Sequence, residues 1–179
     1  MSGGSRLLTR IALFAALIYV LSWGTSYLPN VNLIFFVVFM AGFVWGAGAG
    51  FLVGLLGMGL WSAFNPYGPA DFAIMLAQMF GMALNGPVGY FFGKTNWRKR
   101  SRWSLAAGLV LAAVVGTLLF YIPVNFADAW IYQPFWPRFI TGMVWSLISL
   151  AANILIYPLL FSVARYLYDR ESKLSWRSC

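Results

Sequence analysis

Six apolar runs, joined by short polar or glycine-rich segments, make up most of this 179-residue chain. A helix needs about 20 apolar residues to cross a bilayer, and it satisfies its own backbone hydrogen bonds in hydrocarbon. The chain is 61% hydrophobic and 9% charged, which leaves too little polar surface to cover a soluble globule. We therefore expect an all-α membrane protein with a single integral membrane domain, residues 1–179. The six expected transmembrane helices cover about residues 7–26, 31–44, 47–64, 69–92, 103–121 and 138–163.

The residue types that carry most metal and redox chemistry are scarce. The sequence has no His, and its one Cys is Cys179, so disulfides and zinc, haem or iron–sulfur sites lack their ligands. No GxxxxGK[ST] motif for a nucleotide is present. We therefore expect no metal, no cofactor and no enzymatic activity. An intramembrane enzyme is disfavoured because only Asp71 and Asp128 supply carboxylates outside the C-terminal tail.

The basic residues predict the orientation of the chain. With six crossings, eleven of the twelve Lys and Arg residues fall on one side of the membrane. Cytoplasmic loops carry an excess of these residues, so this side should be cytoplasmic and hold both termini. The eleven are Arg6, Arg10, Lys94, Arg98, Lys99, Arg100, Arg102, Arg165, Arg170, Lys173 and Arg177. They are scattered over helix ends next to the membrane, so we expect no nucleic-acid partner.

Arg138, the exception, lies on the outer side at the start of the sixth helix, where the helix dipole disfavours a cation. An anionic group should therefore lie near it. Asp71 and Asp128 are expected on the same side, among polar and aromatic residues typical of a small-molecule site. These neighbours are Asn65, Tyr67, Asn125, Trp130, Tyr132, Gln133 and Trp136.

Two helix faces extend this site inward. Asp71, Met75, Gln78 and Met82 recur at intervals of four, three and four residues, which places them on one face of the fourth helix. A similar stripe on the sixth helix contains Arg138, Trp145, Ser149 and Asn153. Polar side chains are costly when they face lipid, so we expect the two faces to line one cavity that opens to the outside.

Each of these residues also has a purely structural interpretation. Asp71 could only cap the fourth helix, and the outer tryptophans could form the aromatic belt found at membrane interfaces. Arg138 could pair with Asp71 or Asp128 to hold two helices together. Gln78 and Asn153 could make hydrogen bonds between helices, which are common in membrane bundles.

Small residues on the first and third helices permit close helix contacts. Ala12 and Ala16 form a small-xxx-small pair on the first helix. The third helix begins with a glycine-rich stretch and continues with small residues, which are Gly46, Gly50, Gly54 and Gly57. Such residues serve either internal packing or the docking of another membrane subunit.

Several segments together resemble the substrate-binding S components of energy-coupling factor (ECF) transporters. The resemblance covers most of the chain and rests on TRIALFAA with its AxxxA element, AGFVWGAGAGFLVG, NPYGP and NGPVGY, which begin at residues 9, 41, 65 and 85. It implies a six-helix subunit in the plasma (inner) membrane of a prokaryote that captures a vitamin or vitamin precursor from outside. Its partners would be an EcfT-like transmembrane coupling subunit, which Ala12 and Ala16 would face, and two ATPase subunits. It also implies that the loops after helices one, three and five and helices four to six hold the ligand.

A different class of function remains open. A membrane scaffold such as the rod-shape protein MreD is similar in size and helix count, but it carries no transported ligand. A scaffold has no use for a polar cavity that opens to the outside, so the face of the fourth helix and Arg138 discriminate between the two functions.

Overall fold

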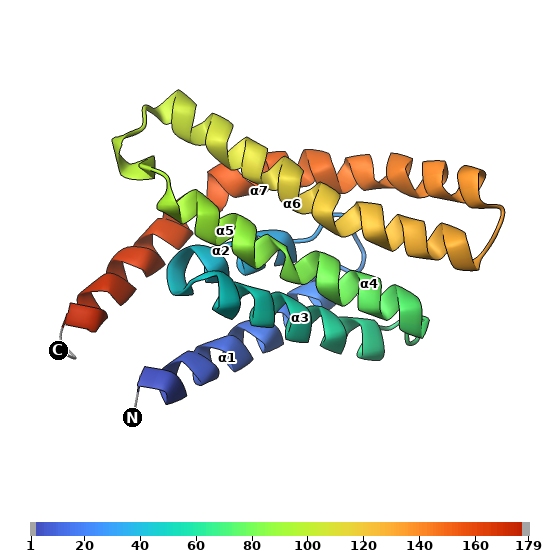
Figure 1. The fold of residues 1–179 in the computed structure, drawn as a ribbon, viewed down its shortest axis with the longest axis horizontal. Helices are drawn as coiled ribbons and strands as arrows, with labels where there is room; N and C mark the ends of the chain where they lie inside the picture. The colour runs from blue at the N-terminus through green and yellow to red at the C-terminus, as the bar shows by residue number, and fades with distance from the viewer. Residues whose placement is uncertain (1–2, 177–179) are drawn as a thin grey trace.

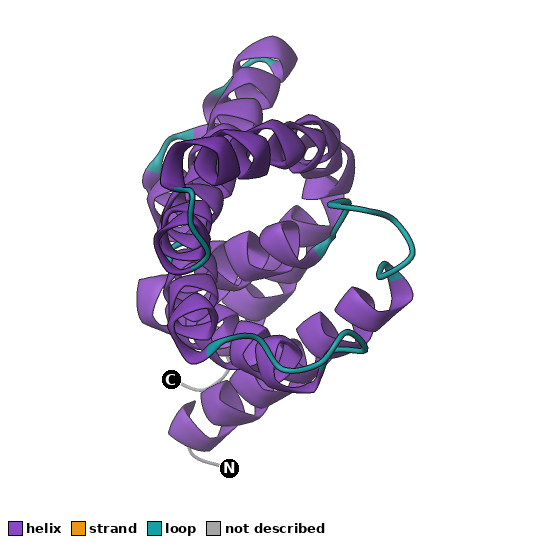
Figure 2. Ribbon diagram, turned by 90° about the vertical axis from the view of Figure 1, so that its right-hand side faces the viewer, coloured by secondary structure: helices purple, strands orange, loops and turns teal. Residues whose placement is uncertain are grey.

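The computed structural model describes residues 3–176, which form helices joined by loops, with no β-strand among them (Figures 1 and 2). Arg177 and Cys179 lie outside the described residues. The elements are α1 (Gly3–Gly24), α2 (Ile34–Trp45), α3 (Ala47–Phe64), α4 (Phe72–Ala83), α5 (Asn85–Lys94), the short 3-10 helix η1 (Trp97–Lys99), α6 (Arg102–Ile131) and α7 (Phe135–Trp176).

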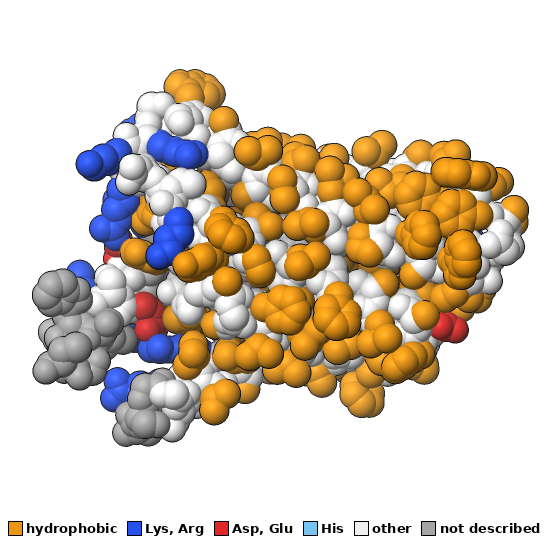
Figure 3. Space-filling view, in the orientation of Figure 1, with side chains coloured by type: hydrophobic (Ala, Val, Ile, Leu, Met, Phe, Trp, Pro, Cys, Tyr) orange, Lys and Arg blue, Asp and Glu red, His pale blue; other side chains and the backbone are white. Residues whose placement is uncertain are grey.

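Both ends of the chain lie at the same end of the molecule, which we call the proximal end (Figure 1). Lys and Arg side chains gather there, whereas hydrophobic side chains cover the middle of the face seen in Figure 3. We call the opposite end, where α6 is joined to α7, the distal end. The basic residues gather at one end, as their positions along the sequence predict.

Five segments of the described chain are long and apolar enough to cross a membrane. They are Gly4–Gly24, Ala47–Phe64, Phe72–Lys94, Arg102–Ile131 and Phe135–Lys173. The other apolar helix, α2, has 12 residues, which at 1.5 Å per residue give a length of about 18 Å against a hydrocarbon core of about 30 Å. The structure is therefore consistent with a multi-pass membrane protein, and six crossings stay a prediction.

Several predicted helix boundaries are wrong. The fourth helix begins at Phe72 instead of residue 69, and it is interrupted at Leu84 because Pro87 has no N–H and its ring crowds the carbonyl of Ala83. The expected connection over residues 123–137 is mostly helical. Pro123 lies inside α6, and neighbouring helices in a bundle can satisfy the carbonyl that it leaves free.

Close backbone contacts fix the position of α2. Ten consecutive residues of α2, Ile34–Phe43, are buried, and the helix packs against α3, α5 and α7. Gly42, Gly50 and Gly86 meet at one point: a Cβ on Gly42 would lie 1.8 Å from the Gly86 carbonyl oxygen, and one on Gly86 would lie 2.3 Å from the Gly50 carbonyl carbon. The small residues therefore serve internal packing here, and α2 is held in the centre of the bundle.

We predict that Gly86→Ala destabilises the protein by roughly 1–3 kcal/mol or more, because the added methyl group must displace backbone atoms of α3. Thermal unfolding of the protein in detergent should show a lower midpoint. Gly48→Ala is the matched control, since a Cβ at Gly48 has no atom within 4 Å. An unchanged midpoint in Gly86→Ala would show that the three helices do not meet this closely.

Candidate functional site

The segment that joins α1 to α2, residues 25–33, contacts α6 and α7 through Asn30 and leaves Tyr27, Leu28 and Pro29 exposed. Its residue Asn30 has a positive φ of 58°, a conformation that Asn adopts more readily than other side-chain-bearing residues. Turn hydrogen bonds from Thr25, Ser26 and Leu28 to carbonyls three or four residues earlier satisfy the start of the segment. Because residues 25–33 are not part of a regular helix, α2 begins only at Ile34 and is short.

Asn30 fastens this segment to α6 and α7. Its side-chain amide donates a hydrogen bond to the Trp145 carbonyl at 3.1 Å, and its Oδ1 accepts one from the Tyr121 hydroxyl at 3.3 Å. The Ser149 hydroxyl donates to the Asn30 carbonyl and lies 2.6 Å from the Tyr121 hydroxyl. Non-helical backbone inside a membrane bundle needs such partners.

A cavity of about 330 Å³ lies beneath this segment, and we call it the Gln78 cavity. Its volume is at the lower end of the range of small-molecule sites, roughly 300–1,000 Å³. It is lined by the end of α1, residues 25–33, the start of α2, and parts of α3, α4 and α6. The lining residues are Ser22, Thr25, Ser26, Leu28, Pro29, Asn30, Val31, Asn32, Ile34, Phe35, Met58, Trp61, Tyr67, Gln78, Met82, Phe120, Tyr121 and Val124.

The polar groups of this cavity are held in place by hydrogen bonds. The Ser62 hydroxyl donates to the Gln78 Oε1 at 2.6 Å, and the Tyr67 hydroxyl donates to the Ser26 carbonyl at 2.8 Å. The second bond ties the α3–α4 loop to residues 25–33. The Ile34 N–H donates to the Asn32 Oδ1 at 3.1 Å, which fixes the orientation of that amide. The Gln78 cavity is thus bordered by two loops that contact each other, and it stays partly open to the surface.

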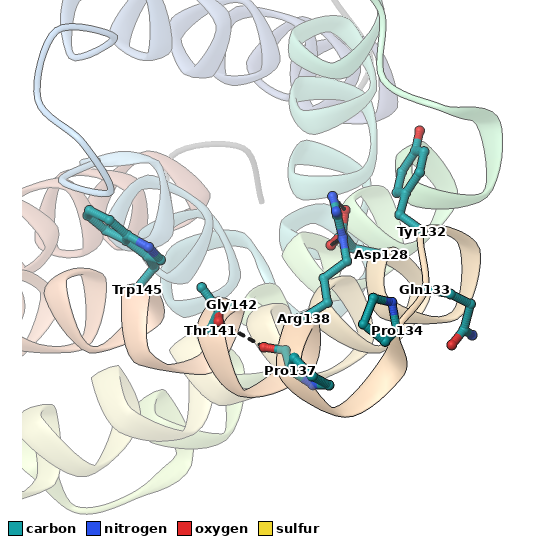
Figure 4. A pocket seen from close by; sticks show the side chains of 9 residues that line it. All are labelled: Asp128, Tyr132, Gln133, Pro134, Pro137, Arg138, Thr141, Gly142 and Trp145. Carbon is teal, nitrogen blue, oxygen red and sulfur yellow. Dashed lines mark hydrogen bonds and ion pairs between the residues drawn. The ribbon is translucent and has the colours of Figure 1, made fainter.

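A second cavity of about 480 Å³ lies at the distal end, between the end of α6 and the start of α7, and we call it the Arg138 cavity. Figure 4 shows the guanidinium of Arg138 beside the carboxylate of Asp128. Arg138 Nε lies 2.5 Å from Asp128 Oδ2, and the guanidinium lies 4.8 Å from the centre of the Tyr132 ring. The lining residues are Asp128, Tyr132, Gln133, Pro134, Pro137, Arg138, Thr141, Gly142 and Trp145.

The expectation of an anion near Arg138 is confirmed, and that anion is Asp128. The alternative pairing of Arg138 with Asp71 is wrong. Asp71 is the N-cap of α4, where its Oδ1 accepts a hydrogen bond from the Ala73 N–H at 3.1 Å. It is exposed and lines neither cavity.

We expected the fourth and sixth predicted helices to line one cavity. The structure instead has two separate cavities, one lined in part by α4 and the other by α7. The Gln78 cavity and the Arg138 cavity have no lining residue in common. Gln78 and Met82 of α4 line the first, Trp145 of α7 lines the second, and Asn30 contacts α7 between them. The sequence does not predict that Asn30 would contact α7 at this point.

The other candidate residues lie apart from the two cavities. Asn65 shapes the α3–α4 loop, where its Oδ1 accepts from the Tyr67 N–H at 2.9 Å. Asn125 donates to the Ser146 hydroxyl at 3.0 Å, and buried Asn153 donates to the Thr117 hydroxyl at 2.9 Å. The last two bonds join α6 to α7, as the structural interpretation of Asn153 predicts.

Trp130 and Trp136 are exposed at the distal end, each with 68% of its surface accessible. Trp130 stacks on Phe126, and Trp136 packs edge-on against Phe135. Neither lines the Gln78 cavity or the Arg138 cavity. Their position is typical of an interfacial aromatic belt.

Several lining residues were not predicted from the sequence. Ser22, Thr25, Ser26, Asn30 and Asn32 all line the Gln78 cavity. The available signal was their spacing: five small polar residues fall within eleven positions between two strongly apolar runs. This density exceeds what a simple turn between helices needs.

Among the described residues no group of three or more His, Cys, Asp or Glu side chains could hold a metal ion. Comparison with models of protein families, with curated proteins and with solved structures found no match.

We predict that Asn30→Gly keeps the backbone conformation of residues 25–33 but loosens the segment. The change removes two side-chain hydrogen bonds worth about 0.5–1.5 kcal/mol each, so amide hydrogen exchange in this segment should become about 5- to 150-fold faster. Asn96→Gly, at an exposed position without a side-chain cap bond, is the control. Equal exchange in both variants would contradict the role of Asn30.

Proposed function

We propose that this protein is the substrate-binding membrane subunit of an ECF-type importer, which captures a vitamin-like small molecule outside the cell and delivers it through partner subunits. The observation that carries the proposal is the Gln78 cavity, which is bordered by two loops that contact each other and has no Lys or Arg among its lining residues. Bound ligand would be reached by moving residues 25–33, whose polar contacts to α6 and α7 lie at one residue, Asn30.

The proposal includes an orientation. The basic proximal end, with both termini, would face the cytoplasm of a prokaryote, and the distal end would face outward. The chain would cross the plasma membrane six times, with α2 and residues 25–33 together making the second crossing. Non-helical backbone at this depth is tolerated where it lines a cavity or is buried in protein.

The proposal also includes partners. Ala12 and Ala16 are exposed on α1, whereas Ile11, Ala15 and Ile18 of the same helix are buried. An exposed small-xxx-small pair permits close approach of another membrane helix, which would be that of the coupling subunit. ATP hydrolysis would be supplied by the two ATPase subunits, and this chain would do no chemistry on its ligand. A scaffold without a ligand accounts less well for the Gln78 cavity.

We predict that a small molecule co-purifies with the protein in detergent at about one molecule per chain, and that Gln78→Leu abolishes this. The substitution removes the amide from the Gln78 cavity at nearly constant side-chain volume. Mass spectrometry of the denatured sample measures the released molecule. Gln133→Leu, in the Arg138 cavity, should retain it. The absence of any such molecule, or its loss only in Gln133→Leu, would contradict the proposed site.

The orientation predicts the labelling of single cysteines in intact cells. In a Cys179→Ser background, Gln133→Cys at the distal end should react with a membrane-impermeant maleimide. Ser101→Cys at the proximal end should react only after lysis, because the reagent must reach the cytoplasm. Both positions are exposed. The reverse pattern would refute the inferred topology.

A further inference from the structure

No ionisable side chain that can carry a charge at neutral pH lies among the described residues that line the Gln78 cavity. The polar groups there are hydroxyls and amides, with the rest of the lining apolar or aromatic. Such a lining contrasts with that of the Arg138 cavity, which holds both an acid and a base. The two cavities therefore differ in the charge of the ligand that they can hold.

Every acidic side chain of the protein already has a partner. Asp169 pairs with Arg98, and Glu171 pairs with Arg10, both at the proximal end. Asp128 pairs with Arg138, and Asp71 caps α4. No carboxylate is therefore left to neutralise a cation in the Gln78 cavity.

The Gln78 cavity also has no base that could neutralise an anion. Arg138 is the one base at the distal end among the described residues, and its guanidinium makes two hydrogen bonds to Asp128. An unpaired ion loses hydration in a cavity whose lining offers no opposite charge, and this penalty reaches several kcal/mol as burial becomes complete. This penalty selects for a ligand without net charge and without separated charges.

The amides indicate which polar atoms the ligand presents. The Ile34 N–H can only donate, so the atom of the Asn32 amide that it contacts must be the oxygen, Oδ1. The NH₂ group of Asn32 is therefore at the opposite edge of the amide. Among the described residues it has no hydrogen-bond partner. Gln78 uses one edge of its amide for Ser62, which leaves the other edge for a ligand. A group that accepts a hydrogen bond, such as a carbonyl or a ring nitrogen, would satisfy the Asn32 donor.

We propose that the Gln78 cavity binds a small uncharged molecule that carries carbonyl or ring-nitrogen acceptors, and that Asn32 donates a hydrogen bond to one of them. The proposal rests on the proposed function, because it assigns a ligand class to the same site. Trp61, Phe35 and Phe120 supply apolar surface for the ring of such a molecule. Charged and zwitterionic molecules of similar size are excluded by the cost of burying their ions.

Asn32→Asp tests this assignment with little change in shape. The carboxylate still accepts from the Ile34 N–H, but the free donor becomes a charged acceptor that repels the acceptor of the ligand. We expect affinity for the ligand to fall at least about tenfold. Asn96→Asp makes the same chemical change at an exposed position of the proximal end and should leave affinity unchanged.

The experiment is equilibrium dialysis of the full chain in lipid nanodiscs against a defined mixture of neutral, anionic, cationic and zwitterionic metabolites, read by mass spectrometry. Support would be enrichment of uncharged, acceptor-bearing metabolites that is lost in Asn32→Asp and kept in Asn96→Asp. Enrichment of a charged or zwitterionic metabolite that depends on Gln78 would overturn the ligand class and leave the proposed function intact. If no metabolite is enriched in a Gln78-dependent way, the proposed function fails, and the ligand class fails with it.

Discussion

Backbone that leaves helical geometry inside a membrane bundle must find hydrogen-bond partners in the protein, because hydrocarbon offers none. Residues 25–33 meet this constraint through their own turn hydrogen bonds, through the Tyr67 hydroxyl that donates to the Ser26 carbonyl, and through Asn30. The side chain and carbonyl of Asn30 contact Tyr121, Trp145 and Ser149. The Gln78 cavity lies beneath this segment, which is held against the bundle by these hydrogen bonds while Tyr27, Leu28 and Pro29 stay exposed. The polar lining, the short α2 and the separation from the Arg138 cavity all follow from that placement.

Two further features shape the bundle: the close contacts among glycines and the distribution of charged side chains. Gly42, Gly50 and Gly86 bring α2, α3 and α5 together, so that a helix of only 12 residues is buried on all sides. At the distal end, Asp128 pairs with Arg138, and both side chains are partly exposed. No charged side chain of the described residues lines the Gln78 cavity. The molecule therefore confines its free bases to one end and offers only amides and hydroxyls in the Gln78 cavity.

The sequence predicted the features that depend on local composition. The third helix, Ala47–Phe64, has the predicted bounds, and the gathering of bases at one end follows from their positions along the chain. Gln78 faces a cavity, as expected for an amide in an apolar helix, but residues of α7 do not line that cavity. The prediction makes α6 too short because a Pro favours a helix end, although Pro123 lies inside the helix. It also makes α7 too short, because the apolar run ends near residue 163 whereas the helix continues to Trp176. The role of Asn30 depends on contacts with residues more than 90 positions away, which no local pattern specifies.

The most direct test is an experimentally determined structure of the protein in a lipid bilayer. We expect Asn30 within hydrogen-bonding distance of Tyr121 and Ser149, and ligand density bounded by Gln78 and Asn32. Residues 25–33 extended into solvent, with side chains filling the space beside Gln78, would contradict the account.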